Sequence, residues 1–131
     1  KYVESLALYT GSIFGGIATK AAYNNGEEWL EQLLDYLDVN VLFLQEYLSE
    51  KLPKAKLYEP EGTYLAWIDF SGYNIKHEDL SELFLKKAKI VLSEGKIFGD
   101  EGENYFRLNF GCNKNMLKEC IDKISQVINN I

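Results

Sequence analysis

Residues 105–111 show the clearest pattern in the chain, a strict alternation of apolar and polar side chains. A period of two predicts a strand with one face against a hydrophobic core. The core side of this strand would carry Phe106, Leu108 and Phe110. The opposite side would carry Tyr105, Arg107 and Asn109.

The longest helical pattern runs from about Glu27 to Lys51, where apolar residues recur three or four positions apart. One stripe of aliphatic side chains would face a core: Leu30, Leu33, Leu34, Leu37, Val41, Leu44 and Leu48. A second, aromatic series recurs every seven residues and lies off that stripe: Trp29, Tyr36 and Phe43. Either one wide apolar band holds both series, or the helix packs against two bodies, the second of which would be a partner.

Shorter patterns predict the remaining elements. Helices are expected from Ile13 to about Tyr23, from His77 to about Ala88 and from Lys114 to about Asn129. Ser12 and Asn113 are the candidate N-caps, although the Gly15–Gly16 pair weakens the start of the first helix. Strands are expected at Lys56–Tyr58, Thr63–Phe70 and Lys89–Leu92. Residues 2–10 would form the end of a helix that Gly11 breaks.

This order of elements favours an α+β fold. The expected architecture is a small mixed or antiparallel sheet with helices packed on one face, preceded by the long helix. Residues 51–131 would hold the sheet and residues 1–50 would be helical. The stretch 93–102, which carries three glycines, is interpreted as a packed functional loop.

Composition excludes several classes of function. At 131 residues the chain is long enough for one hydrophobic core, and its net charge of −6 argues against binding the nucleic-acid backbone. No apolar run approaches the ~20 residues of a membrane span, and no signal peptide is visible. The chain lacks an initiator Met, which favours a fragment or a processed protein.

Few residues bear reactive chemistry. Cys112 and Cys120 form neither a disulfide framework nor a metal-ligand spacing, and free thiols fit a reducing cytosol. The only histidine, His77, opens a helix in a charged stretch and is predicted to be a solvent-exposed surface side chain. We therefore expect no metal site and no histidine-activated nucleophile in this chain.

Arg107 is the only arginine among 14 basic residues. A guanidinium presents a planar fork that binds a carboxylate through two parallel hydrogen bonds, and an ammonium does not. Two interpretations stay open from the residues alone. Arg107 binds a small acid, or it is structural, either paired with an Asp or Glu of the chain or lying at an edge with its head in water.

Similarity to a known family is carried by four ordered segments: AAYNNGEEWL (21–30), EGTYLAWID (61–69), GKIFG (95–99) and FRLNFGC (106–112). Together they resemble the C-terminal part of class I/II aminotransferase-like enzymes, and most of all the carbon–sulfur lyase (cystathionine β-lyase-like) branch. The resemblance implies a parent with a large pyridoxal-phosphate domain and a small C-terminal domain. Residues 1–50 would then link to the missing large domain, and residues 51–131 would form the small one.

The resemblance also implies a role for Arg107, which would bind the α-carboxylate of an amino-acid substrate. The parent would cleave C–S bonds by β-elimination or would transaminate, with pyridoxal 5′-phosphate as cofactor. The family's Schiff-base lysine motif does not occur here, so no catalytic, cofactor-binding or metal-binding residue is expected in this fragment, which would be inactive alone. A homodimeric, cytoplasmic parent is expected. The alternative is a stand-alone α+β binding or interaction module without catalysis.

Overall fold

A computed structural model describes residues 12–131 of the chain, so the helix end predicted within residues 2–10 lies outside the described residues. The chain divides into two units, one ending at Asp35 and one running from Tyr36 to Ile131.

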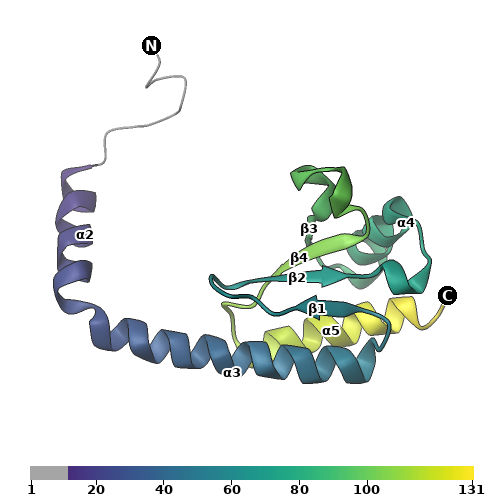
Figure 1. Cartoon of the computed structure of the whole chain (residues 1–131), viewed down its shortest axis with the longest axis horizontal. Coiled ribbons are helices and arrows are strands. Elements are labelled where there is room, and N and C mark those ends of the chain that lie inside the picture. Colours follow the sequence, from purple (N-terminus) through teal and green to yellow (C-terminus); the bar gives the residue numbers. More distant parts are fainter. Residues whose placement is uncertain (1–11) are drawn as a thin grey trace, which may run out of the picture. The chain divides into compact units, whose positions relative to one another are not determined.

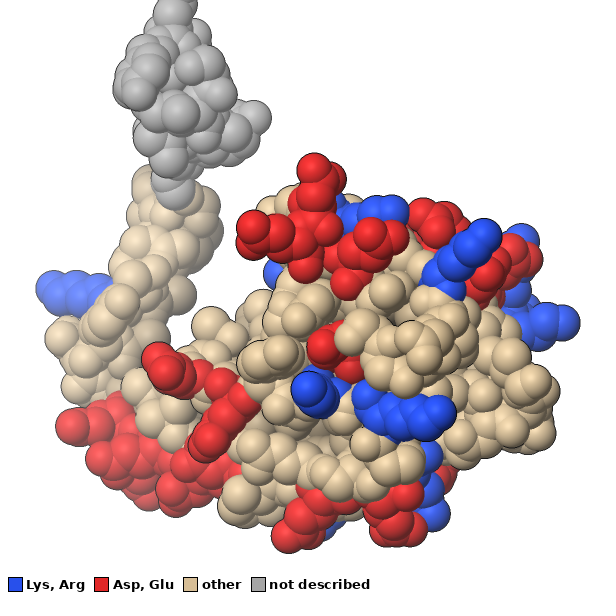
Figure 2. All heavy atoms as spheres, turned by 45° about the vertical axis from the view of Figure 1, so that its right-hand side comes forward, with Lys and Arg blue, Asp and Glu red and all other residues tan. Residues whose placement is uncertain are grey.

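In the first unit, helix α2 spans Ile13–Asn25 and confirms the predicted first helix. It begins despite Gly15 because the Ser12 side chain accepts a hydrogen bond from the Gly15 backbone N–H at 2.9 Å. No residue of α2 is buried, and its large apolar side chains Ile13, Phe14, Ile17 and Tyr23 are exposed. Figure 2 shows α2 as an almost uniformly uncharged surface.

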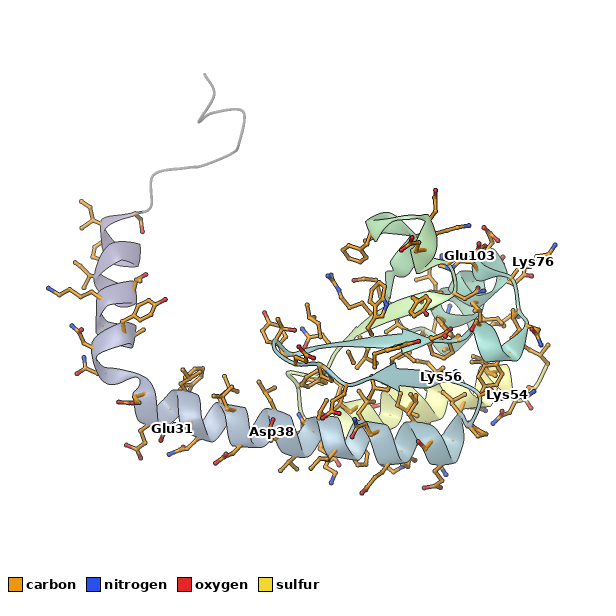
Figure 3. All side chains as sticks on the ribbon, in the orientation of Figure 1. Glu31, Asp38, Lys54, Lys56, Lys76 and Glu103 are labelled. Atoms are coloured by element: carbon orange, nitrogen blue, oxygen red, sulfur yellow. The ribbon has the colours of Figure 1, made fainter. Side chains whose placement is uncertain are left out.

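Helix α3 spans Glu27–Lys51, as its periodicity predicts. Its acidic side chains include Glu31 and Asp38, both labelled in Figure 3. Within the second unit, α3 buries Leu37, Asn40, Leu44 and Leu48. Leu30 and Leu34, which belong to the same predicted stripe, are exposed. The stripe is therefore a core surface only over the C-terminal half of the helix.

The second unit is built on a four-stranded antiparallel sheet with strand order β1-β2-β4-β3 (Figure 1). The strands are β1 (Lys56–Tyr58), β2 (Leu65–Asp69), β3 (Ser93–Glu94) and β4 (Tyr105–Asn109). The predicted strands at residues 56–58, 63–70 and 105–111 are confirmed, with β2 and β4 slightly shorter than expected.

The predicted strand at Lys89–Leu92 is wrong. Helix α4 (His77–Glu82) continues as a π-helix (η2, Leu83–Ala88), and Lys89 then adopts a left-handed conformation with φ 58°. The Ile90 backbone N–H donates back to the Phe84 carbonyl at 2.9 Å, which ties this stretch to the helix instead of to the sheet. Strand β3 begins only at Ser93.

One face of the sheet packs against helices. Ala66, Ile68, Phe106 and Leu108 are each at most 3% exposed on this face. Helix α5 (Lys114–Ile128) contributes Leu117, Ile121, Ile124 and Ile128, and the Asn113 side chain caps it by accepting from the Asn115 backbone N–H. In the second unit, α5 and the C-terminal half of α3 lie on the same side of the strands (Figure 1). The α+β fold with helices on one face is thus confirmed.

Candidate functional site

Arg107 lies at the centre of β4 on the face turned away from the helices. Phe106 and Leu108 on either side of it are buried, whereas Arg107 is half-buried. Its cross-strand neighbours are Trp67 on β2 and Ser93 on β3. The strict alternation in the sequence therefore placed Arg107 correctly, because successive side chains of a strand point to opposite faces.

Two contacts hold the guanidinium. Arg107 Nη2 donates to the Ser93 hydroxyl at 3.2 Å, and the Arg107 Cζ atom lies 4.8 Å from the centre of the Phe98 ring. Among the described residues, Arg107 forms no ion pair with an Asp or Glu. A guanidinium carries five N–H donors, so most of its donors are left for a carboxylate or for water.

An aromatic cluster borders Arg107 on the same face. The Trp67 ring stacks on Tyr105 at 5.6 Å and meets Phe98 edge-on at 5.7 Å. Tyr58 lies 6.1 Å from Tyr105. These rings and the 95–102 stretch line an open hollow of about 720 Å³. The Tyr58 hydroxyl, together with burial and the Asp69 carboxylate, raises the pKa of Tyr105 to about 12, so this phenol stays protonated and can donate a hydrogen bond.

The loop at residues 95–103 carries Phe98 on a short turn, η3 (Gly95–Phe98), followed by η4 (Asp100–Gly102). Its two ends touch, since a Cβ added at Gly95 would lie 2.3 Å from the Gly102 carbonyl oxygen. Lys96 reaches Glu78 at 3.0 Å and Glu103, labelled in Figure 3, at 3.5 Å. The two ends of the loop are therefore packed together, but the prediction of a packed loop is wrong for its apolar side chains, because Ile97 and Phe98 are 70% and 56% exposed.

His77 was predicted to be a solvent-exposed surface side chain, and this prediction is wrong. The side chain is 2% exposed, and its ring stacks on Phe106 with 5.1 Å between centroids. Nδ1 accepts the Asn104 backbone N–H at 3.1 Å, and Nε2 lies 3.2 Å from a Glu94 carboxylate oxygen. The charged residues around His77 in sequence misled the prediction, because its partners lie 17 and 27 residues away.

The two cysteines are poor nucleophiles in this fold. Burial raises the pKa of the Cys112 thiol, and burial with the neighbouring Cys112 raises the pKa of Cys120 to about 11. Within residues 12–131, no group of three or more His, Cys, Asp or Glu side chains could hold a metal ion. No helix of the described part is both long and apolar enough to cross a membrane.

The lysines that the structure describes do not fit a covalent pyridoxal-phosphate site. An imine-forming amine must lose its proton, which burial favours by lowering its pKa. None of these lysines is buried. Neighbouring carboxylates raise the pKa of three of them: Glu50 acts on Lys51, Glu78 on Lys96 and Asp122 on Lys118. We therefore assign no reaction step through the cofactor to these residues.

Sequence reasoning identified Arg107 but missed the groups that surround it. The sequence predicts Ser93 and Phe98 within a functional loop and Trp67 within a strand, but it places none of the three next to Arg107. The signal that could have found Trp67 is the strand period, which puts it on the same face as Arg107 once β2 and β4 are paired. No local signal in the sequence indicates Ser93.

Comparison with known proteins gives consistent results, although no family model matches the chain. The chain is 36% identical over 115 residues to cystathionine beta-lyase PatB of Bacillus subtilis and 38% identical over 119 residues to cystathionine beta-lyase of Corynebacterium glutamicum. These matches cover 88% and 89% of this chain but only 30% and 31% of the two relatives.

A solved structure agrees with these matches. The PLP-bound C-S lyase from Staphylococcus hominis superposes with a TM-score of 0.83 at 32% identity, covering 96% of this chain and 34% of that one. The chain thus spans about a third of the length of the proteins it matches. By sequence and by fold, the chain is similar to one part of the cystathionine beta-lyases and of the PLP-bound C-S lyase.

Proposed function

We propose that this chain is the C-terminal, substrate-binding part of a pyridoxal-phosphate-dependent carbon–sulfur lyase or aminotransferase, and that Arg107 binds the α-carboxylate of the amino-acid substrate. The observation that carries the proposal is the state of Arg107. Its guanidinium is held from one side by Ser93 and Phe98, and it has no acidic partner among the described residues.

The contacts suggest how binding would work. The Ser93 hydroxyl accepts from one Nη2–H and restrains the fork, while the guanidinium lies over the Phe98 ring. A carboxylate would approach the remaining N–H donors edge-on and accept two parallel bonds. Hydrogen bonds to charged groups are worth about 1.5–3 kcal/mol each, which is enough to orient a small substrate.

The cofactor would belong to the rest of the protein. The Staphylococcus hominis relative is PLP-bound, and this chain matches about a third of it. Pyridoxal phosphate supplies an electron sink for negative charge that develops at the α-carbon. Residues 1–50 would link residues 51–131 to the part of the protein that holds the cofactor. The exposed apolar side chains of α2 fit a contact with that part.

The test uses the full-length protein that contains this chain. We expect Arg107→Lys to lower kcat/KM for amino-acid substrates by about ten- to a hundred-fold, because a single ammonium cannot replace the bidentate contact. Lys86→Arg is the matched control, since Lys86 is exposed and its one ion pair within residues 12–131 is with Glu82, four positions earlier on the same helix. An unchanged kcat/KM for Arg107→Lys would refute the carboxylate role.

Two assays on the same protein distinguish the reaction classes. Release of a thiol and a keto acid from cystathionine would identify β-elimination, and amino-group transfer to an added keto acid would identify transamination. The upstream reading frame offers a further check, because a stand-alone binding module would lack a preceding domain with a lysine-bearing cofactor motif.

Two finer proposals concern the whole protein. We infer a cytoplasmic location, which the two free thiols of Cys112 and Cys120 support. We also infer a homodimer, on the family resemblance. Sedimentation of the full-length protein across a range of concentrations would test the dimer, and fractionation of cells would test the location.

A further inference from the structure

We propose that His77 is a positioning residue that closes the 95–103 loop and thereby holds the two groups that orient Arg107. This inference rests on the proposed function, because it assigns His77 a part in binding the substrate carboxylate. It concerns a residue that touches neither Arg107 nor, on this geometry, the carboxylate bound to it.

The imidazole joins both ends of the loop. Glu94 immediately precedes Gly95, and its carboxylate lies 3.2 Å from His77 Nε2. Asn104 immediately follows Glu103, and its backbone N–H donates to His77 Nδ1 at 3.1 Å. One buried side chain on α4 therefore fixes the two points at which the loop leaves and rejoins the sheet.

The hydrogen bonds define the state of the ring. Since Nδ1 accepts a backbone N–H, it carries a lone pair, and the proton of the neutral imidazole lies on Nε2. Nε2–H then donates to Glu94, so both ring nitrogens are satisfied. The ring is 2% exposed and stacked on Phe106, the residue that precedes Arg107 on β4.

Strand β3, which lies next to Arg107, depends on the bond between His77 and Glu94. Strand β3 is only two residues long, and it pairs with β4 only through Ser93 opposite Arg107 and Glu94 opposite Phe106. Asn104 adopts a left-handed conformation with φ 64°, which an Asn tolerates but does not prefer. The Asn104 carbonyl accepts the Phe70 backbone N–H at 2.9 Å, so this end has one backbone bond to the chain beyond β2, and the Glu94 end has only the short β3 pairing.

The loop ends control Arg107 through two residues. Ser93 adjoins Glu94 and accepts from Arg107 Nη2, while Phe98 lies within the loop against the guanidinium. A shift of Glu94 or Asn104 would move both contacts at once. The Lys96 ion pairs with Glu78 and Glu103 also cross this region, but they lie on the exposed surface and contribute little each.

Three substitutions in the full-length protein separate the contributions of the ring. His77→Phe keeps the stacking on Phe106 and removes both hydrogen bonds. His77→Asn keeps an acceptor near the position of Nδ1, and His77→Gln keeps a donor near the position of Nε2. Only an imidazole places both groups at once, so neither amide should restore the loop fully.

The first readout is hydrogen–deuterium exchange of residues 93–104, which needs no activity. We expect His77→Phe to raise exchange in this segment at least tenfold, and His77→Asn to raise it less. The second readout is steady-state kinetics, in which His77→Phe should raise KM for amino-acid substrates several-fold with a smaller change in kcat. Lys86→Arg again serves as the control for both readouts.

The outcomes distinguish this inference from the proposed function. Unchanged loop exchange and unchanged KM in both His77→Phe and His77→Asn, beside a raised KM in Arg107→Lys, would overturn the role of His77 alone. Faster loop exchange in His77→Phe with an unchanged KM, while Arg107→Lys raises KM, would also overturn it. An unchanged KM in Arg107→Lys would instead overturn the carboxylate role of Arg107, and the proposed role of His77 would fall with it.

Discussion

Substitutions of Asn40 test how α3 is joined to the chain that follows β4, the strand that carries Arg107. The Asn40 side chain is completely buried on α3, and Nδ2 donates to the carbonyl oxygens of Phe110 and Cys112, both at 2.9 Å. The Tyr36 hydroxyl donates to the same Cys112 carbonyl at 3.1 Å. Replacing Asn40 by Ala removes both amide bonds and leaves the two carbonyls in place.

The expected loss of stability follows from these contacts. Two neutral hydrogen bonds contribute about 0.5–1.5 kcal/mol each, and a buried Phe110 carbonyl left without a partner adds about 1–3 kcal/mol. The Cys112 carbonyl keeps Tyr36. Asn40 Oδ1 is itself buried without a partner among the described residues, so removing this atom offsets part of the loss of stability. We expect Asn40→Ala to lower the free energy of unfolding by about 2 kcal/mol.

Asn40→Asp tests the same contact through the pH dependence of the free energy of unfolding. It keeps the shape of the side chain but turns an oxygen toward two carbonyl oxygens, so the ionised form is both buried and repelled. Burial raises the pKa of this carboxyl above its unfolded value. The stability of the variant is then greatest at low pH, where the protonated carboxyl can donate, and falls as the pH rises through the raised pKa.

Urea unfolding followed by circular dichroism, at pH 5 and pH 7, measures both variants. Glu46→Ala on the same helix is the control, since Glu46 is exposed and should change the free energy of unfolding by less than about 0.5 kcal/mol. A loss below that size in Asn40→Ala, or an Asn40→Asp protein as stable as the parent at pH 7, would refute the role assigned to the amide.

Three further predictions concern the loop, the thiols and the exposed helix. Gly95→Ala should lower the free energy of unfolding in urea by more than about 1 kcal/mol, because the added Cβ would lie 2.3 Å from a backbone oxygen. Gly62→Ala, whose added Cβ has nothing within 4 Å, should leave it nearly unchanged. Cys120, with its pKa raised to about 11, should react with a thiol reagent roughly a hundred-fold more slowly at pH 8 than a free cysteine, and about tenfold faster per pH unit up to that pKa; a pH-independent rate would contradict this. The chain alone should self-associate in sedimentation runs through its exposed N-terminal apolar side chains, and Trp29→Glu, at a side chain 66% exposed, should weaken the association; a monomer at every concentration would argue against it.

Elements with strong local periodicity could be predicted from the sequence. Strand β4 follows from the alternation around Arg107, and α5 follows from its 3.6-residue stripe and the Asn113 cap. Both patterns repeat over several residues and agree with the local cap or turn, so tertiary contacts reinforce them. The face of the strand on which Arg107 lies could be predicted for the same reason.

Predictions failed at one backbone turn and at contacts between distant segments. The aliphatic run 90–92 resembles a strand, but the π-helix before it and the left-handed Lys89 turn it away from the sheet. Asn40 lies on the buried stripe of α3 between Leu37 and Leu44, but the sequence does not show what its amide bonds to, because the carbonyls that accept from it are 70 and 72 residues away.

The fold class, the strand that carries Arg107 and the similarity to a known family could all be predicted from the amino-acid sequence. The groups that surround this arginine could not. Ser93 and Phe98 come from β3 and the 95–103 loop, and both contact Arg107. His77 comes from α4 and bonds to Glu94 and Asn104 at the two ends of the loop. Such contacts depend on packing between distant segments, which no local period encodes.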